Sequence, residues 1–180
     1  MGYGIVRQVV RARFLLTSRE AARGVIRETA DRYLAVAEEL GPARGATVVN
    51  VPKMMGVDEE MRDWSFYMLL EHHVIVNGFI RRVVEDLERG EKPIWATGRD
   101  PKHDVLPKGG AGEEQVAAFR ESVDGYLEME KRLGRLRGTE TWPHPLFGVF
   151  DAHKWHCMFG FHLKVHFGQA ERVYEGAVGD

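Results

Sequence analysis

Cysteine, net charge and long apolar runs are nearly missing from this sequence. Its single cysteine, Cys157, cannot form a disulfide within the chain, which favours a reducing compartment such as the cytoplasm. The 25 basic and 27 acidic residues leave a net charge of -2, so attraction to nucleic acid or to an anionic membrane is not expected. No run approaches the roughly 20 apolar residues that span a bilayer. Arg7, Arg11 and Arg13 also interrupt the N-terminal apolar residues too often for a signal peptide.

The composition is that of a globular protein with a packed core. Hydrophobic residues make up 44% of the 180 residues and charged residues 29%, without internal repeats or low-complexity tracts. A chain of this length fits one domain, so we expect residues 1–180 to form a single domain.

Four long segments carry the three- and four-residue apolar spacing that is typical of amphipathic helices, which predicts an all-α fold built as a four-helix bundle. We expect helices over about residues 17–40, 58–89, 113–137 and 152–175. Thr17 with Glu20 forms a potential capping box for the first, and Asp58 is a potential N-cap for the second. On the stripe of the third, either Met129 or Glu130 follows Tyr126. Residues 1–16 are expected to add a short N-terminal helical extension.

The connection between the second and third expected helices is long. It covers residues 91–112, and loops of this length without structure are uncommon unless they serve a purpose. At about 3.3 Å per extended residue the segment can run the full length of a bundle, which would let the helices on either side of it lie parallel.

Two histidines on the last expected helix are candidates for metal ligands. His162 and His166 lie on a stripe with Trp155, Phe159 and Gln169, because all five follow one another at steps of three or four. Imidazoles four residues apart on a helix can reach a common ion, although such a pair can also be a hydrogen-bonded part of the core. Gln169 can either orient a ligand or join two helices by a hydrogen bond.

A third ligand is expected from the second helix, where His72 and His73 are adjacent. Both have apolar residues at helical spacing around them, and periodicity does not choose between them. Of the other histidines, His153 is expected in solvent and His156 lies off the metal-binding stripe. His103 falls in the crossover.

Two further residues are not expected to carry chemistry. His144 lies between two prolines in a turn, where a structural or surface role is expected. Cys157 lies on neither histidine face and has no evident base beside it, so a nucleophilic thiol is not expected.

The segment His162-Leu-Lys-Val-His166-Phe-Gly168-Gln169 resembles the last-helix signature of the DinB-like (DinB/YfiT-like) superfamily, in which Gly-Gln follows two histidine ligands. His144-Pro-Leu-Phe-Gly148 is similar to a motif that precedes this helix in one branch of the superfamily.

In the second expected helix, Trp64-Ser65 followed by His72 is similar to the family pattern before the first metal ligand. The resemblance runs from about residue 58 to residue 169 and favours His72 over His73. It implies an up-down-down-up bundle that binds one divalent metal ion, commonly zinc or nickel, through three histidines, and it makes a homodimer plausible.

The resemblance also implies a type of reaction, because some relatives are thiol S-transferases or isomerases. Such an enzyme would use the metal to bind a low-molecular-weight thiol and deliver it to an electrophilic substrate. The alternatives are a non-catalytic protein that the metal stabilises, a metal-dependent hydrolase, and a bundle without metal. We favour the transferase over the hydrolase because Glu71 and Glu171 point away from the histidine faces, which leaves no evident carboxylate base.

Overall fold

The computed structural model describes residues 3–100 and 102–179, and the expectations for residues 1, 2, 101 and 180 lie outside this range. The chain is mostly helical, as predicted. Its α-helices are α1 (Tyr3–Leu16), α2 (Arg19–Gly45), α3 (Phe66–Glu88), α4 (Glu114–Arg132) and α5 (Ala152–Val178). The shorter elements are the 3-10 helices η1 (Glu59–Met61) and η2 (Ile94–Ala96) and the strands β1 (Val49–Asn50), β2 (Asp63–Trp64), β3 (Thr141–His144) and β4 (Gly148–Asp151).

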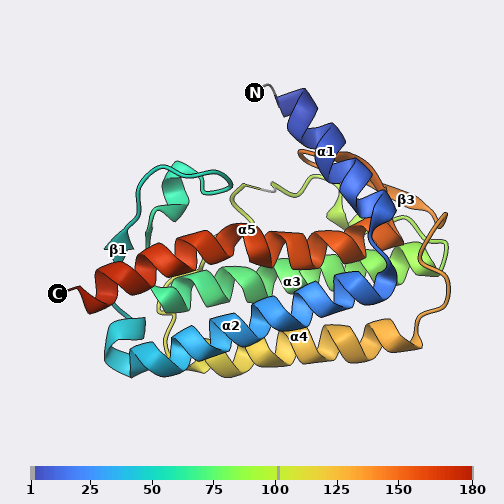
Figure 1. The fold of residues 1–180 in the computed structure, drawn as a ribbon. Coiled ribbons are helices and arrows are strands. Elements are labelled where there is room, and N and C mark those ends of the chain that lie inside the picture. The colour runs from blue at the N-terminus through green and yellow to red at the C-terminus, as the bar shows by residue number, and fades with distance from the viewer. Residues whose placement is uncertain (1–2, 101, 180) are drawn as a thin grey trace.

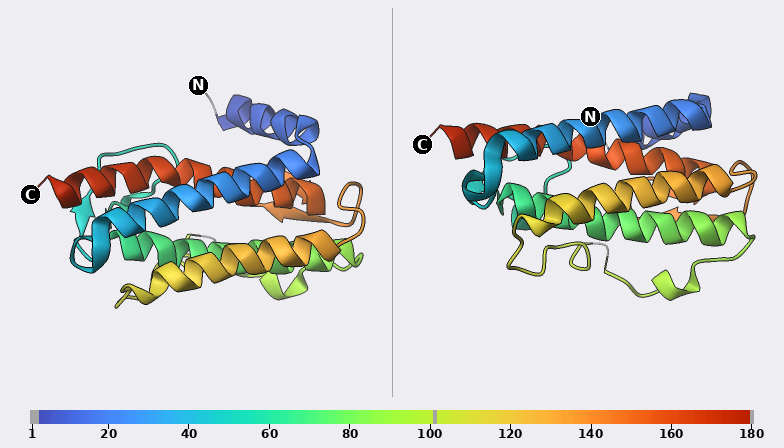
Figure 2. Two further views of the ribbon diagram at one scale, coloured as in Figure 1. Left: turned by 60° about the horizontal axis from the view of Figure 1, so that its bottom comes forward. Right: turned by 90° about the horizontal axis from the view of Figure 1, so that it is seen from below.

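The four long helices α2 to α5 lie side by side (Figures 1 and 2). In these views α3 and α4 run in one direction, whereas α2 and α5 run in the other. Helix α2 packs on α5 and α4, and α3 packs on the same two helices from the opposite side. The segment between α3 and α4 runs back along the outside of α3, as the right panel of Figure 2 shows. No helix in the described part of the chain combines the length and the apolar character that crossing a membrane requires.

Close packing between α2 and α5 depends on a glycine. A Cβ at Gly160 would lie 3.3 Å from the backbone nitrogen of Ile26 and 3.0 Å from a side-chain carbon of Val25. Both helices carry fully buried large side chains at this contact, including Ile26 and Phe159. The helix that carries the candidate ligands is thus held rigidly by its neighbour.

The helix starts differ from the prediction at two places. Ser18, not Thr17, caps α2, since its hydroxyl accepts a hydrogen bond from the backbone nitrogen of Ala21 at 3.0 Å. Helix α3 begins at Phe66 and not near Asp58, and Ser65 is its N-cap. The residues between them form η1 and then β2, which pairs with β1 and holds the chain extended up to Trp64.

The helix ends differ as well. Helix α2 extends to Gly45, but Gly41 within it is not helical, with a φ of 63°, so the regular helix stops at Leu40 as expected and a short helical segment follows. Helix α4 ends at Arg132, five residues before the predicted end. The start of α5 is as expected, since Asp151 caps it by accepting from the backbone nitrogen of Lys154 at 3.0 Å.

Two short antiparallel strand pairs were not predicted, so the all-α expectation is incomplete. Strands β1 and β2 pair over two residues, and β3 and β4 pair from Thr141 opposite Asp151 to His144 opposite Gly148. Segments of two to four residues are too short to show the alternation of apolar and polar residues that indicates a strand. In addition, β3 contains Pro143, and proline usually argues against a strand.

The N-terminal extension is helical, as predicted. Its buried residues Val10 and Phe14 face the rest of the protein, and the Phe14 ring lies 5.7 Å from the rings of both Phe150 and Phe161. Helix α1 therefore covers the start of α5 and the β3–β4 hairpin (Figure 1).

Candidate metal centre

Three histidines meet between α3 and α5. One ring nitrogen each from His72, His162 and His166 lies within 4.8 Å of the other two. The Nε2 atoms of His72 and His162 are 3.2 Å apart. Zinc binds imidazole nitrogen at about 2.0–2.1 Å, so two ligands of one tetrahedral ion are about 3.3 Å apart. The spacing therefore fits a single small metal ion, and we call these three residues the histidine cluster.

Hydrogen bonds orient two of the three rings. The Nδ1–H of His72 donates to the carbonyl of Val105 at 2.8 Å, and that of His166 donates to Oε1 of Gln169 at 3.0 Å. In both rings Nε2 is then the atom with a free lone pair. Outer partners of this kind fix the tautomer and the orientation of metal-binding histidines.

Gln169 performs both roles that the sequence left open. Its Oε1 accepts from His166, while its Nε2 donates to the carbonyl of Met61 at 2.7 Å. The side chain is fully buried. Gln169 thus joins α5 to the end of η1 and orients a candidate ligand at the same time.

Hydrogen bonds join the crossover, residues 91–112, to α3 next to the histidine cluster. Besides the bond from His72 to Val105, the backbone nitrogen of Lys108 donates to Oε1 of Glu71 at 3.1 Å. The long connection therefore also supplies an acceptor that orients a candidate ligand.

His73 lies beside the histidine cluster and not in it. Its Nε2–H donates to the Tyr33 hydroxyl at 2.9 Å, and that hydroxyl donates to the carbonyl of Leu163 at 3.1 Å. The ring of His73 packs against Tyr33 of α2, whereas His72 contacts the crossover.

Burial keeps the cluster neutral at pH 7. His72 and His166 are 1% and 4% exposed, whereas His162 is partly exposed. Burial lowers the pKa of His72 to about 3 and the pKa of His166 below its ordinary value. It also lowers the pKa of His162 well below 6.5, with a further contribution from the neighbouring histidines. Metal binding requires neutral imidazole, so the rings are already in the binding form.

The expectation that His153 lies in solvent is wrong. The residue is 2% exposed, and its Nε2–H donates to the carbonyl of Thr17 at 3.0 Å. The same nitrogen lies 3.6 Å from Sγ of Cys157, but because it carries the hydrogen that it donates to Thr17, it does not act as a base toward this thiol. Periodicity missed this contact because it assigns one buried face to a helix, whereas α1 and the following turn cover a second face of α5. Burial raises the pKa of Cys157 to about 12, which keeps the thiol protonated and unreactive.

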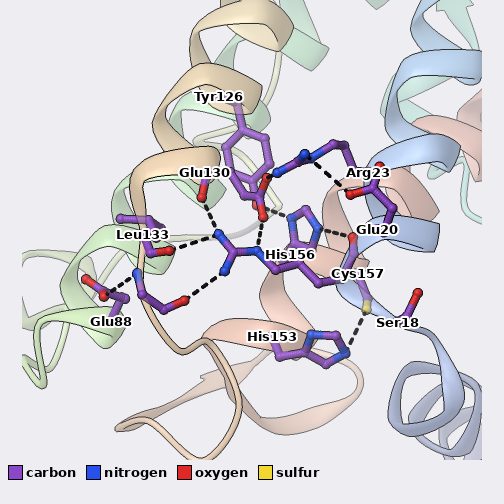
Figure 3. Close-up of polar contacts among 12 residues, drawn as sticks. Ser18, Glu20, Arg23, Glu88, Tyr126, Glu130, Leu133, His153, His156 and Cys157 are labelled. Atoms are coloured by element: carbon purple, nitrogen blue, oxygen red, sulfur yellow. Dashed lines mark hydrogen bonds and ion pairs between the residues drawn. The ribbon is translucent and has the colours of Figure 1, made fainter.

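His156 belongs to a second buried polar group, which we call the Glu130 cluster (Figure 3). The cluster comprises Arg19, Arg23, Tyr126, Glu130 and His156. The Tyr126 hydroxyl donates to Nδ1 of His156 at 2.8 Å, and Nε2–H of His156 donates to the carbonyl of Arg19 at 3.1 Å. Both carboxylate oxygens of Glu130 accept from arginines. Sequence periodicity left Met129 and Glu130 as alternatives on the stripe of the third predicted helix, and the structure buries both.

The two remaining histidines lie outside both clusters. His103 is exposed in the crossover, and its Nδ1 is 2.6 Å from the carboxylate of Asp100. His144 lies in β3, where its Nδ1 accepts from the backbone nitrogens of Leu146 and Phe147 and its ring packs 5.2 Å from Trp155. Burial lowers the pKa of His144 to about 4.

Comparison of the chain with protein-family models, with curated proteins and with solved structures gives no match. The functional argument accordingly depends on the motif residues and on the geometry of the histidine cluster.

Proposed function

We propose that this protein binds one divalent metal ion through Nε2 of His72, His162 and His166 and leaves a coordination position for an exogenous ligand. The convergence of three neutral imidazoles supports the proposal most directly. In the described part of the chain, no carboxylate or thiol joins these three donors as a fourth protein ligand. Structural zinc sites are closed by four protein ligands, whereas three ligands are typical of sites that take a water or substrate.

We further propose that the chain is a DinB-like up-down-down-up bundle. The directions of α2 to α5 in Figures 1 and 2 support this assignment. The contacts of the motif residues near the histidine cluster also support this assignment. Ser65 caps α3, the Trp64 ring packs 5.3 Å from the His72 ring, and Gln169 orients His166.

The proposed reaction is the transfer or isomerisation of an electrophilic substrate with the help of a low-molecular-weight thiol. A bound divalent cation supplies Lewis acidity, which lowers the pKa of a thiol or water that binds next to it. Three neutral ligands leave the charge of zinc or nickel uncompensated, which favours an anionic fourth ligand such as a thiolate. The absence of a carboxylate from the cluster, among the described residues, favours this reaction over hydrolysis, which needs a general base.

Elemental analysis tests the metal site. Protein purified without an affinity tag should contain about one divalent ion per chain. The double change His162→Ala and His166→Ala should abolish Zn(II) binding, because a single histidine remains in the cluster. His103→Ala is the matched control, since His103 is exposed and lies outside the cluster. A wild-type chain that binds no metal, or a double variant that binds as tightly as wild type, would contradict the proposed site.

A panel of small thiols tests the reaction class. For the Zn(II)-loaded protein, a thiol present at 1,000 times its Kd should stabilise the fold by about 4 kcal/mol, measured as a rise in Tm. The double histidine variant should show no such rise. Metal binding without a response to any thiol would favour a site that only stabilises the fold.

A further inference from the structure

The histidine cluster is asymmetric in its outer contacts. His72 and His166 each donate Nδ1–H to an acceptor, namely the carbonyl of Val105 and Oε1 of Gln169. Nδ1 of His162 is buried and has no hydrogen-bond partner among the described residues. When Nε2 of His162 is the metal donor, its Nδ1 carries the hydrogen, so a buried donor needs an acceptor.

A buried acceptor without a partner lies in the neighbouring ring. Nε2–H of His73 donates to the Tyr33 hydroxyl, which leaves Nδ1 of His73 with a lone pair. This Nδ1 is likewise buried and without a partner in the described part of the chain. The ring centres of His73 and His162 are 5.3 Å apart, and the rings are nearly perpendicular, at 87°.

Leaving both atoms unpaired would be costly. A buried donor or acceptor without a partner costs about 1–3 kcal/mol, and most such groups in native proteins are paired with protein atoms or ordered water. The two rings are 5.3 Å apart, centre to centre, and a hydrogen bond or one bridging water between this donor and this acceptor would pair both atoms.

We propose that His73 is a positioning residue for His162, whose Nδ1–H it accepts at its own Nδ1. The proposal rests on the proposed metal binding and gives the third candidate ligand the outer partner that the other two already have. His73 is held for this role by the bond to Tyr33, whose hydroxyl donates to the carbonyl of Leu163. With this bond, a chain of hydrogen bonds runs from His162 on α5 through His73 on α3 and Tyr33 on α2 to Leu163 on α5. Three helices together then set the orientation of the His162 ring.

Two substitutions at His73 separate positioning from packing. His73→Phe keeps a ring but removes the acceptor, and we expect it to weaken Zn(II) binding about 10- to 100-fold, the usual effect of losing an outer-shell partner. His73→Asn can place its Oδ1 near the position of Nδ1, and we expect it to recover much of the affinity. Competition with a chromophoric chelator measures Zn(II) affinity in both variants.

A spectroscopic measurement on the wild-type protein covers the case in which a variant fails to fold. In the ¹⁵N-labelled Zn(II) form, Nδ1–H of His162 should exchange slowly with solvent, and the Nδ1 resonance of His73 should shift when Zn(II) is added. Tyr33→Phe removes one hydroxyl only, and it should speed the exchange of the His162 hydrogen while leaving that of His72 unchanged.

The outcomes distinguish this proposal from the proposed function. If wild type binds no Zn(II), both fail. If wild type binds Zn(II) but His73→Phe binds it equally tightly, or the Nδ1 resonance of His73 does not respond to Zn(II), the role of His73 is overturned and the metal site stands. A loss of affinity in His73→Phe together with recovery in His73→Asn supports the proposal, because a packing role alone would not favour the smaller polar residue.

Discussion

The Glu130 cluster and the histidine cluster are both buried and polar, yet they satisfy their polar atoms in opposite ways. In the Glu130 cluster each oxygen of the carboxylate accepts from an arginine, and both nitrogens of His156 are hydrogen-bonded. In the histidine cluster, hydrogen bonds orient the rings of His72 and His166 from outside, and one ring nitrogen of each of the three histidines lies within 4.8 Å of the other two.

The difference distinguishes a structural network from the proposed metal site. Burial pushes the pKa of Glu130 up, but hydrogen bonds from Arg19 and Arg23 outweigh it and hold the pKa below its ordinary value. The charge of Glu130 is therefore matched within the fold. The histidine cluster instead brings three neutral nitrogen donors together, and among the described residues no carboxylate or thiol joins them. Such a site gains most from a cation that the chain does not supply.

The largest expected difference between the clusters is in acid stability. An unfolded histidine binds a proton near pH 6.5, whereas folded His72 of the histidine cluster does so only near pH 3. Folded His144, which lies outside both clusters, does so near pH 4 and adds to the same loss. The unfolded state therefore binds more protons below about pH 6.5, and the free energy of unfolding falls as pH drops. By pH 5 each of these two residues costs about 2 kcal/mol.

Urea unfolding of the protein after metal removal, at pH 7, 6 and 5, measures this loss. Added Zn(II) should restore stability at pH 6, because it binds the neutral rings of the histidine cluster. The Glu130 carboxylate should act in a separate window: its depressed pKa means that its contribution is present above about pH 4.5 and is lost as pH falls further. His156 in the same cluster adds to the loss below about pH 6.5, because burial lowers its pKa. Stability that stays constant from pH 7 to pH 5 would contradict the neutral, buried state of the histidines.

The second largest effect is expected from Glu130→Gln. The change leaves Arg19 and Arg23 without their buried counter-charge, and we expect unfolding to become easier by about 3 kcal/mol, as for other broken buried ion pairs. Zn(II) affinity should not change. Glu128→Gln on the same helix is the control, since Glu128 pairs with Lys131 at the surface and its loss should leave the unfolding midpoint unaltered.

The sequence predicted the histidine cluster better than the Glu130 cluster, for a physical reason. His162 and His166 share one stripe on one helix, and such a spacing can be read from the chain alone. The Glu130 cluster is built from α2, α4 and α5, and the partners of Glu130 depend on how those helices pack. Sequence periodicity left either Met129 or Glu130 on the buried face, and it carries no information about which arginines reach Glu130.

The same reasoning explains why one helix start is predicted correctly and another is not. Asp151 was correctly expected to precede the last helix, because a local side-chain hydrogen bond determines its cap. Asp58 is an equally good cap in isolation but starts only η1, since pairing between β1 and β2 holds the following residues extended. The choice of His72 over His73 depended on motif resemblance, and the structure relates it to packing: His73 faces Tyr33, whereas His72 faces the crossover.

The smallest of these effects is expected at Gln169, where two substitutions separate two hydrogen bonds. Gln169→Ala removes the acceptor for His166 and the donor to Met61, and Zn(II) affinity should fall about 10- to 100-fold. Gln169→Glu keeps an acceptor for His166 but places a carboxylate oxygen against the carbonyl of Met61. We expect this variant to lose stability yet to retain or exceed wild-type Zn(II) affinity, because a carboxylate partner makes a ligand histidine more basic. Equal losses of affinity in both variants, measured by chelator competition, would mean that Gln169 acts through packing against Met61 and not through His166.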